Sequence, residues 1–541
     1  MQKLKLTGLS ILSGLLMGLS WPATGNLAPL FFFALLPLLY VEYTVSQNPD
    51  RLKSRHFYFF ALLTFITFNG YTTWWIYFAS GPGMLMAVVL NSIFMGIIWL
   101  WFHNIKKNFG DKKGYMSLVF LWIAFEWLHY HWEFSHPWAT FGNTFANYPQ
   151  LIQWYEFTGV HGGTLWLLIV NILCFQLYRK VVILGESMKI QAKSIGIILI
   201  MIVIPMLISV LMYTNYHEKA EPTEVVVIQP NIDPYRDKFG GMTVAEQIRR
   251  IISLAEEKTT ASTSYVVAPE TAIPRGSLES ELEMNYSILE IRQYLERHPQ
   301  VKFVIGASTY IDYPQSEQKP TPTARPDKQT GGWYDAFNSA LLIEKDKTIQ
   351  IYHKSKLVLG VERLPFAKIL APLENFAINL GGTFGSLGTE KEAKFLDAGT
   401  HQIAPVICYE SIYGDYVGDY ISKGSDLIFV ITNDGWWEDT PGYKQHLSYS
   451  RLRAIESRRS IARSANTGIS CFINQRGDVI DPTDWWVPAV ISGTINSNSE
   501  LTFYSKYGDY LGRVFAAISA ILLLWHWTLK LKRRFGVSVN V

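Results

Sequence analysis

Eight apolar stretches of membrane-spanning length, or nearly so, constrain the fold of this chain more than any other feature. They lie near residues 6–22, 27–44, 57–79, 84–103, 115–130, 163–179, 195–214 and 511–530. About 20 consecutive apolar residues suffice for a helix to cross a bilayer. Lys3 and Lys5 precede the first stretch as in a signal peptide, but a clean A-x-A cleavage site is missing and another apolar stretch follows at once. We therefore predict a multi-span α-helical membrane bundle of about eight transmembrane helices, the first of them uncleaved.

Lysine and arginine residues are concentrated in alternate connections between these stretches. They occur near the N-terminus and after the second, fourth, sixth and eighth stretches, whereas the connection 131–162 contains neither. Cytoplasmic loops of membrane proteins are enriched in both residue types. We therefore expect both chain termini on the cytoplasmic side of the membrane and residues 215–510 on the outer side.

The chain is predicted to have three parts, which are a seven-span bundle at 1–214, an outward domain at 220–505 and a C-terminal transmembrane helix at 511–530. Its 541 residues are too many for one ordinary domain, and 17% charged and 14% aromatic residues fit a mixture of membrane and water-soluble parts.

The formal net charge of +3 is too small to indicate binding of nucleic acid. Three cysteines cannot form a disulfide framework.

The outward region has the sequence pattern of an α/β domain. Short apolar runs rich in β-branched residues recur, as is typical of buried strands, at 224–232, 264–270, 302–310, 339–344, 402–410, 425–434 and 467–474. Helical patterns lie between several of them, for example at 244–258 and 281–298. The Pro-rich polar segment 313–332 is predicted to be a surface loop without chemistry.

Three apolar runs of this region end in side chains that can react, Glu270, Lys354 and Cys408. Active sites of open α/β sheets lie beyond the carboxyl ends of strands, so these residues could meet in space. A cysteine attacks as its thiolate, a carboxylate can accept the thiol proton, and a lysine can stabilise an oxyanion. Taken singly, each residue has a simpler explanation, as packing for the cysteine and as surface charge for the other two. Cys174 and Cys471 are both interpreted as packing residues.

The sequence around these three residues resembles the nitrilase superfamily. The motifs are PET (269–271), YHKSKLVLGVE (352–362), ICYE (407–410) and TNDGWW (432–437). A nitrilase-like domain on the outer side of a membrane bundle is similar to the apolipoprotein N-acyltransferase family, and the resemblance covers essentially the whole chain. It implies that residues 220–505 form an α/β nitrilase-like αββα sandwich.

The resemblance also implies roles for individual residues. Glu270 would be the general base, Lys354 the oxyanion stabiliser and Cys408 the nucleophile. Supporting catalytic roles are implied for Glu362, Tyr409 and Glu410. The backbone N–H of Tyr409 is a candidate for a second oxyanion donor. The resemblance implies neither a metal nor an organic cofactor.

The candidate substrate-binding residues are aromatic or apolar. They are Trp436, Trp437, Phe239, Leu364 and Phe366. Phe239 lies near the position where many family members carry Trp, and LVLGVE stands where the family has LVPFGE, which leaves the acyl-chain or head-group preference open. Trp436 and Trp437 are as consistent with packing as with a substrate entrance. The segment 363–382 is predicted to be a mobile lid that dips into lipid, and the alternative is an amphipathic helix lying on the sandwich.

Several other polar side chains are interpreted as structural. Glu126 and Asn69 lie within predicted spans, where helix–helix hydrogen bonds are the expected role. Three histidines of the outer loop lie among tryptophans and tyrosines and are interpreted as part of an interfacial aromatic belt, so no metal is assigned to them; they are His129, His131 and His136. His446 in the outward domain is also interpreted as structural.

The resemblance implies an enzyme that transfers a fatty acyl chain from a membrane glycerophospholipid to an apolipoprotein. The acceptor would be the α-amino group of an N-terminal diacylglyceryl-cysteine, and the acyl chain would pass through a thioester on Cys408. The expected partners are the phospholipid donor, the apolipoprotein acceptor and the bilayer. We expect a monomer in the bacterial cytoplasmic (inner) membrane, with the catalytic domain on its periplasmic face.

Two alternatives stay open on the sequence. A membrane-anchored nitrilase-type amidase that hydrolyses a small amide would share Glu270, Lys354 and Cys408, but it would need neither seven preceding spans nor an apolar lid. A non-catalytic binding or transport protein could be built on an inactive enzyme, although the retention of all three residues argues against it.

Overall fold

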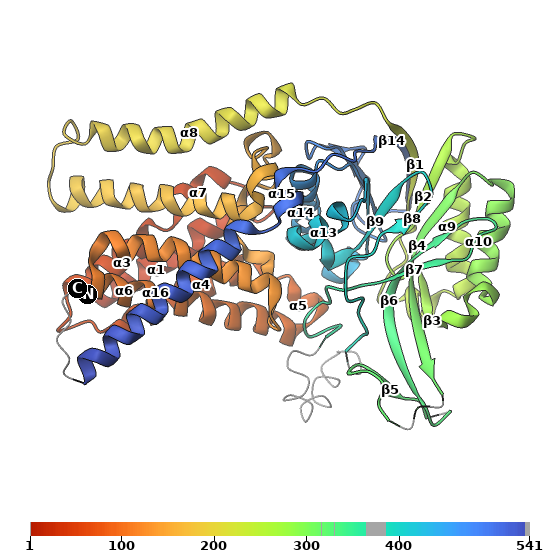
Figure 1. Ribbon diagram of the computed structural model, residues 1–541, viewed down its shortest axis with the longest axis horizontal. Coiled ribbons are helices and arrows are strands. Elements are labelled where there is room, and N and C mark those ends of the chain that lie inside the picture. Colours follow the sequence, from red (N-terminus) through yellow and green to blue (C-terminus); the bar gives the residue numbers. More distant parts are fainter. Residues whose placement is uncertain (1, 315, 317, 329, 364–385, 536–541) are drawn as a thin grey trace. The chain divides into compact units, whose positions relative to one another are not determined.

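The computed structural model describes residues 2–314, 316, 318–328, 330–363 and 386–535 (Figure 1). The chain forms two compact units. A helical unit comprises Met1–Trp75, Met84–Thr214 and Asp509–Val541, and an α/β unit comprises Ile76–Gly83 and Asn215–Gly508. The short helix α5 (Ile76–Ala79) therefore belongs to the α/β unit, although hydropathy alone includes it in the third predicted span.

Helices make up most of the helical unit. They are α1 (Gln2–Ser20), α2 (Phe31–Ala34), α3 (Leu36–Gln47), α4 (Ser54–Thr73), α6 (Gly81–His131), α7 (Tyr155–Tyr178), α8 (Ala192–Asn215) and α16 (Tyr510–Arg534). Among the described residues, five segments are long and apolar enough to cross a membrane, namely Ala28–Gln47, Gly81–His131, Tyr155–Ile183, Ala192–Asn215 and Tyr510–Lys532. The predicted stretches 84–103 and 115–130 both lie in α6, whose backbone leaves the helical region at Gly110 (φ 82°, ψ 175°). These helices fit a membrane bundle, and the number of eight spans stays a prediction.

The helices α8 and α16 leave much of their apolar surface uncovered by protein. Leu199 and Leu207 of α8 are 56% and 51% exposed, and Leu524 of α16 is 66% exposed. Contiguous apolar surface of this kind is unfavourable in water and favourable against lipid chains. The exposure therefore agrees with the predicted membrane location of these two helices.

Polar side chains inside the helical unit form hydrogen bonds between its segments. The buried Glu126 carboxylate accepts from Trp122 Nε1 at 2.9 Å and from Thr164 Oγ1 of α7 at 2.6 Å. The buried Asn69 of α4 donates from Nδ2 to Ser92 Oγ of α6 at 2.9 Å. Buried polar groups in an apolar medium need such partners. The predicted helix–helix hydrogen bonds of Glu126 and Asn69 are confirmed.

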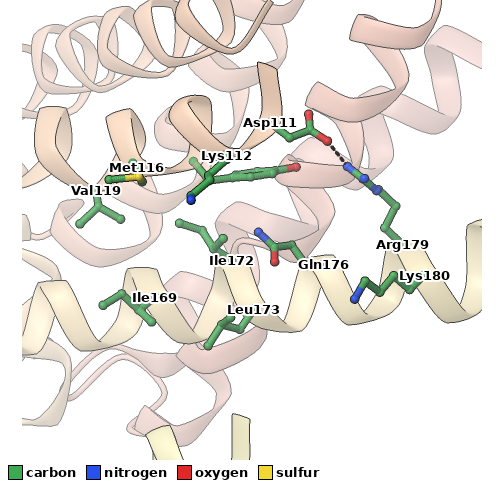
Figure 2. Close-up of a pocket in the computed structure, with 11 residues that line it drawn as sticks. Asp111, Lys112, Met116, Val119, Ile169, Ile172, Leu173, Gln176, Arg179 and Lys180 are labelled. Carbon is green, nitrogen blue, oxygen red and sulfur yellow. Dashed lines mark hydrogen bonds and ion pairs between the residues drawn. The ribbon is translucent and has the colours of Figure 1, made fainter. Parts of the chain in front are cut away.

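The helical unit contains a groove of about 470 Å³ (Figure 2). It lies between the second half of α6 and the C-terminal half of α7, and the residues just after α7 also line it. Its charged lining includes an ion pair between Asp111 and Arg179, together with Lys112 and Lys180. Its apolar lining includes Met116, Val119, Ile169, Ile172 and Leu173. The cations come from two of the Lys- and Arg-rich connections, which therefore meet at one end of the bundle. This arrangement is required if both connections lie on the same side of a membrane, and which side they face stays a prediction.

The described residues of the α/β unit form two β-sheets. The first has the strand order β14-β1-β2-β4-β6-β5, with β3 paired to β4 and β7 paired to β6, and the second has the order β13-β12-β11-β10-β9-β8. The strands of the first are β1 (Pro222–Gln229), β2 (Thr263–Val267), β3 (Ile273–Leu278), β4 (Lys302–Tyr313), β5 (Arg325–Pro326), β6 (Trp333–Ile343), β7 (Gln350–His353) and β14 (Ala489–Asn496). Those of the second are β8 (Leu396–Asp397), β9 (Gln402–Ile407), β10 (Leu427–Thr432), β11 (Ile461–Ala465), β12 (Cys471–Ile473) and β13 (Val479–Ile480).

Helices cover the outer faces of both sheets, so the layers run helix, sheet, sheet, helix (Figure 1). Val226 of β1 is buried in a core shared with α9 (Val244–Lys258) and α10 (Tyr286–Arg297). On the opposite face of the same sheet, the Tyr265 ring contacts the Phe429 ring of the second sheet with centroids 5.3 Å apart. The helices α13 (Gly414–Ser422) and α14 (Pro441–Ser457) pack on the second sheet. The predicted α/β sandwich is confirmed.

The strand directions bring three predicted site residues to one edge of the sandwich. In the first sheet, β2 is parallel to β4, and β7 runs in the same direction because both β4 and β7 are antiparallel to β6. Glu270 follows β2 and Lys354 follows β7, so both lie beyond carboxyl ends of strands. In the second sheet, Cys408 follows β9. A hydrogen bond from the Asn433 backbone N–H, just after β10, to Glu270 Oε2 at 3.1 Å joins the edges of the two sheets.

We expect Ile291→Ala in α10 to destabilise the α/β unit. Ile291 is fully buried in the core beneath the first sheet, and truncation of such a side chain costs about 2–5 kcal/mol because a cavity remains. Thermal unfolding of the full-length protein in detergent should show a lower midpoint for this variant. Gln293→Ala, at an exposed position of the same helix, should leave the midpoint nearly unchanged. Equal midpoints for the two variants would contradict this account of the core.

Candidate active site

Lys354 lies between two carboxylates at the centre of the candidate site. Its Nζ donates to Glu270 Oε1 at 3.0 Å and to Glu362 Oε1 at 2.9 Å. Only 1% of Lys354 is exposed, and Glu270 is also buried. Burial lowers the pKa of Lys354, but the charges of Glu270 and Glu362 outweigh burial and hold this pKa well above its usual value. The ammonium is therefore a permanent positive charge inside the site.

Glu270 is ionised although it is buried. Burial raises its pKa, but the charge of Lys354 and the hydrogen bonds from Asn338 and Lys354 bring the pKa below its ordinary value. Asn338 Nδ2 donates to Glu270 Oε1 at 2.7 Å. A buried carboxylate that keeps its charge at neutral pH can accept a proton from a neighbouring group, as a general base requires.

Cys408 occupies a sharp turn between β9 and the short 3₁₀ helix η9 (Cys408–Ile412). Its φ of 48° lies in the left-handed region, which is uncommon for a residue with a side chain and is often found at functional sites. Its backbone carbonyl accepts hydrogen bonds from Ser411 Oγ at 2.8 Å and from His446 Nε2 at 3.0 Å. These two bonds hold the turn that presents the thiol.

The Cys408 thiol is protonated at rest. Burial, followed by the negative charge of Glu270, raises its pKa well above the ordinary value, and the charge of Lys354 lowers it only in part. A thiol of this kind does not attack until its proton is removed, because the thiolate is the nucleophile. The arrangement therefore favours a step in which deprotonation of Cys408 and attack on a bound carbonyl occur together.

Glu362 has its own structural support. Its Oε1 accepts from Asn338 Nδ2 at 3.1 Å as well as from Lys354, and its Oε2 accepts from the Val358 N–H at 2.8 Å. One amide group of Asn338 thus bridges the two carboxylates that flank Lys354. The sequence did not single out Asn338, which sits beside Lys354 only because β6 pairs with β7 in the observed register.

Glu410 connects the chain around Lys354 with the chain around Cys408. It is fully buried, and it accepts hydrogen bonds from Tyr352 Oη at 2.6 Å, from the Ser355 N–H at 2.7 Å and from the Ile407 N–H at 2.8 Å. Burial raises its pKa to about 7, although these hydrogen bonds lower it. Its position fits a residue that aligns the two halves of the site. Tyr409 beside it is also buried, and its ring lies 5.4 Å from the Tyr413 ring.

A second buried charge network lies next to Cys408. His446 Nδ1 and Asp434 Oδ1 are 2.8 Å apart, and Arg463 donates to Asp434 Oδ2 at 2.6 Å. Burial raises the pKa of Asp434, but the charges of Arg463 and His446 outweigh burial and bring the pKa to about 2. The structural role predicted for His446 agrees with these contacts and with its bond to the Cys408 carbonyl.

Cys408, Asp434 and His446 also offer metal-ligand atoms within 4.8 Å of one another. Each Asp434 oxygen and each His446 nitrogen already takes part in a hydrogen bond, however, with Thr432 and Ser411 among their partners. A metal ion would have to displace several of these bonds. The donor set therefore fits a hydrogen-bonded support for the Cys408 turn better than a metal site.

Three of the five predicted substrate-binding residues lie in the described part of the chain. Trp436 and Trp437 are half-buried and follow β10, and the Trp437 ring lies 5.5 Å from the His446 ring, so Trp437 is near the Cys408 turn. Phe239 is 65% exposed and follows Lys238, a buried lysine that the sequence did not single out. Leu364 and Phe366, like residues 364–382 of the predicted lid, lie outside the described residues.

The sandwich and the cluster of Glu270, Lys354 and Cys408 are the features of a nitrilase-type domain, in which Cys408 is the candidate nucleophile. Two family models match the chain. The model described as apolipoprotein N-acyltransferase N-terminal domain matches residues 13–173, and the carbon-nitrogen hydrolase model matches residues 225–500.

Whole-chain relatives refine this class. An apolipoprotein N-acyltransferase from Chlorobaculum tepidum is 30% identical over 530 residues, which are 95% of each chain. One from Geobacter metallireducens is 26% identical over 529 residues, 95% of this chain and 94% of that protein. The chain belongs to the apolipoprotein N-acyltransferase family, and its enzyme class is N-acyltransferase. A solved amidase structure from Nesterenkonia sp. covers 55% of this chain and 97% of its own, with 14% identity and a TM-score of 0.36, and the family assignment does not depend on it.

We expect Glu410 to make the stability of the protein depend on pH. Because its pKa of about 7 in the folded state lies above its ordinary value, Glu410 binds a proton more tightly in the folded chain. Its contribution to stability is therefore complete below about pH 4 and is lost as the pH rises through about 7, a change of roughly 3 kcal/mol. Thermal unfolding at pH 5 and pH 7.5 should show a smaller pH effect for Glu410→Gln than for the unchanged protein. The same pH effect in both proteins would show that Glu410 does not titrate in this way.

Proposed function

We propose that this enzyme transfers a fatty acyl chain from a membrane glycerophospholipid to the α-amino group of an N-terminal diacylglyceryl-cysteine on apolipoproteins. The observation that carries the proposal is the buried cluster in which Lys354 joins Glu270 and Glu362 beside a protonated Cys408 thiol. The names of the whole-chain relatives support the acceptor, since they are called apolipoprotein N-acyltransferases. The nitrilase-type site supports a covalent route through cysteine.

In the first half-reaction, Cys408 Sγ attacks the ester carbonyl carbon of the phospholipid while Glu270 accepts the thiol proton. The carbonyl oxygen becomes an oxyanion, which the fixed ammonium of Lys354 stabilises. The carbon–oxygen bond to the glycerol then breaks, and Glu270 returns the proton to the leaving oxygen. A lysophospholipid departs, and the acyl chain stays on Cys408 as a thioester.

In the second half-reaction, the α-amine of the acceptor attacks the thioester carbonyl. Glu270 accepts a proton from the attacking nitrogen, and Lys354 again stabilises the oxyanion. The carbon–sulfur bond breaks, the proton passes from Glu270 to the departing sulfur, and an amide forms. Both half-reactions therefore use one base, one cation and one nucleophile, and Glu270 ends in its starting state.

The supporting residues have distinct tasks in this scheme. Glu362 balances the charge of Lys354 and fixes the direction of its ammonium, which must point at the oxyanion. The Tyr409 backbone N–H adds a second donor to the oxyanion, and Glu410 keeps the Lys354 and Cys408 segments in register. Trp436, Trp437 and Phe239 offer apolar contact area for acyl chains.

A membrane location follows from the chemistry of both substrates. Removal of an acyl chain from the bilayer costs about 0.8 kcal/mol for each CH₂ group, so the site must work at the membrane surface. We propose that residues 1–214 and 511–530 form the membrane part, and that residues 220–505 act as a catalytic domain on the periplasmic face of the inner membrane. We further propose that one chain is sufficient, because every residue of the scheme comes from the same chain.

Incubation of the purified enzyme with phospholipid should add the mass of one acyl chain to Cys408. Peptide mass spectrometry locates the adduct, and Cys408→Ala should carry none because it lacks the nucleophile. No adduct on the unchanged protein, together with release of ammonia from small amides, would instead support an amidase.

Glu270→Gln should slow formation of this adduct by a factor on the order of 10²–10⁴, the range typical of a general base. Gln keeps the size of the side chain but cannot accept the thiol proton. Glu256→Gln is the matched control, because Glu256 of α9 pairs with Arg297 outside the site. A normal rate of adduct formation in Glu270→Gln would remove Glu270 from the proposed mechanism.

A further inference from the structure

Lys238 is a second buried lysine of the α/β unit. It lies in a single helical turn, Asp237–Gly241, between β1 and α9, and only 4% of it is exposed. The buried Gln247 of α9 donates from Nε2 to the Lys238 carbonyl at 2.9 Å and to the Met242 carbonyl at 3.1 Å. These bonds fix the turn, so the Lys238 ammonium is delivered to one place beneath the surface.

The Lys238 ammonium binds the backbone of the general base. Its Nζ donates to the Glu270 carbonyl at 3.2 Å and to Thr271 Oγ1. Thr271 has a φ of 47°, in the left-handed region that residues with a side chain rarely adopt. This conformation turns the chain sharply just after Glu270, and it needs support from neighbouring groups to persist.

The same segment is held from the other side by β4. The Gly306 N–H donates to the Pro269 carbonyl at 3.1 Å. A Cβ at Gly306 would lie 2.5 Å from the Thr271 nitrogen and 2.6 Å from the Glu270 Cα, so only glycine permits this close approach. The Glu270–Thr271 backbone is therefore clamped between β4 and Lys238.

Lys238 also lies in the electric field of the site. Burial lowers its pKa to about 8, although the charges of Glu270 and Cys408 raise it. The ammonium thus keeps its proton at neutral pH. Glu270, from the segment after β2, and Cys408, from the turn after β9, are the titratable groups that act on it most strongly. A positive charge near Cys408 stabilises the thiolate over the thiol.

We propose that Lys238 is a positioning residue for acyl transfer. It holds the Glu270–Thr271 backbone in the conformation that directs the Glu270 carboxylate toward Lys354 and the Asn433 N–H, and its charge favours ionised Cys408 at the moment of attack. This inference rests on the proposed function, in which Glu270 removes the Cys408 proton. It assigns to Lys238 a task that Lys354 cannot perform, because Lys354 binds the carboxylate of Glu270 and Lys238 binds its backbone.

The test is the rate at which iodoacetamide alkylates Cys408 in the full-length protein in detergent, measured from pH 6 to pH 10 by peptide mass spectrometry. Lys238→Met should slow alkylation at pH 7.5 by about tenfold, because loss of the nearby positive charge lowers the thiolate fraction of Cys408, and one pKa unit is a tenfold change in that fraction. The difference should shrink above pH 8, where Lys238 of the unchanged protein loses its proton. Lys238→Arg, which keeps the charge, should retain an alkylation rate at pH 7.5 close to that of the unchanged protein. Alkylation needs neither acyl donor nor acceptor, so its outcome is independent of whether phospholipid is the substrate.

Lys302→Met is the matched control. Lys302 is half-buried in the same unit and also donates to a backbone carbonyl, that of Ala398, at 2.5 Å, but it does not contact Glu270 in the described structure. This variant should leave the alkylation rate at pH 7.5 unchanged. A normal rate at pH 7.5 in a folded Lys238→Met protein would overturn the proposal. If Lys238→Met does not fold, the alkylation rate of Thr271→Val tests the proposal instead. This variant removes one hydrogen bond of the Lys238 ammonium but changes no charge. Slower alkylation would support the positioning role of Lys238, and an unchanged rate would overturn it.

Discussion

The site depends on the two charged hydrogen bonds that the Lys354 ammonium forms with Glu270 and Glu362, away from water. A buried charge is costly unless opposite charges and hydrogen bonds compensate it. Here two carboxylates provide that compensation, and Asn338 in turn bridges both of them. One consequence is that Glu270 stays ionised inside the protein. Another is that a positive charge stands ready where negative charge develops on a substrate oxygen.

The fold makes this cluster possible by bringing strand ends from two sheets to a common edge. Glu270 and Lys354 come from one sheet and Cys408 from the other, so each sheet alone would hold only part of the site. Contacts across the edge fix the alignment, including the Asn433 N–H on Glu270 and the Glu410 carboxylate that joins Ser355 to Ile407. The chemistry is therefore a property of the packed sandwich. The strained turn at Thr271 is held by Lys238 and by the Gly306 N–H, and the one at Cys408 is held by Ser411 and His446.

Strand and helix patterns in the sequence predicted an α/β domain, and the resemblance carried by short motifs implied the sandwich and the cluster of Glu270, Lys354 and Cys408. Both kinds of signal consist of consecutive residues. Glu270, Lys354 and Glu362 meet within hydrogen-bond distance, as the resemblance implied, while their catalytic roles stay predictions. The sequence carries no local signal for Asn338 and Lys238, because their places in the site depend on strand register and on the path of a turn. Hydropathy marked the stretches 84–103 and 115–130 as two segments, and the backbone of α6 is indeed interrupted between them at Gly110, whose φ and ψ are not helical.

In the proposed mechanism, one cysteine carries the acyl chain from the first half-reaction to the second. The most direct measurement uses phospholipid with a deuterium-labelled acyl chain to load the enzyme, followed by removal of all free lipid and addition of a diacylglyceryl-cysteine peptide. We expect the labelled mass to leave Cys408 and to appear on the α-amine of the peptide in equal amount, without further donor. A peptide that becomes acylated only when free phospholipid is present, with no label on Cys408 at any time, would contradict it.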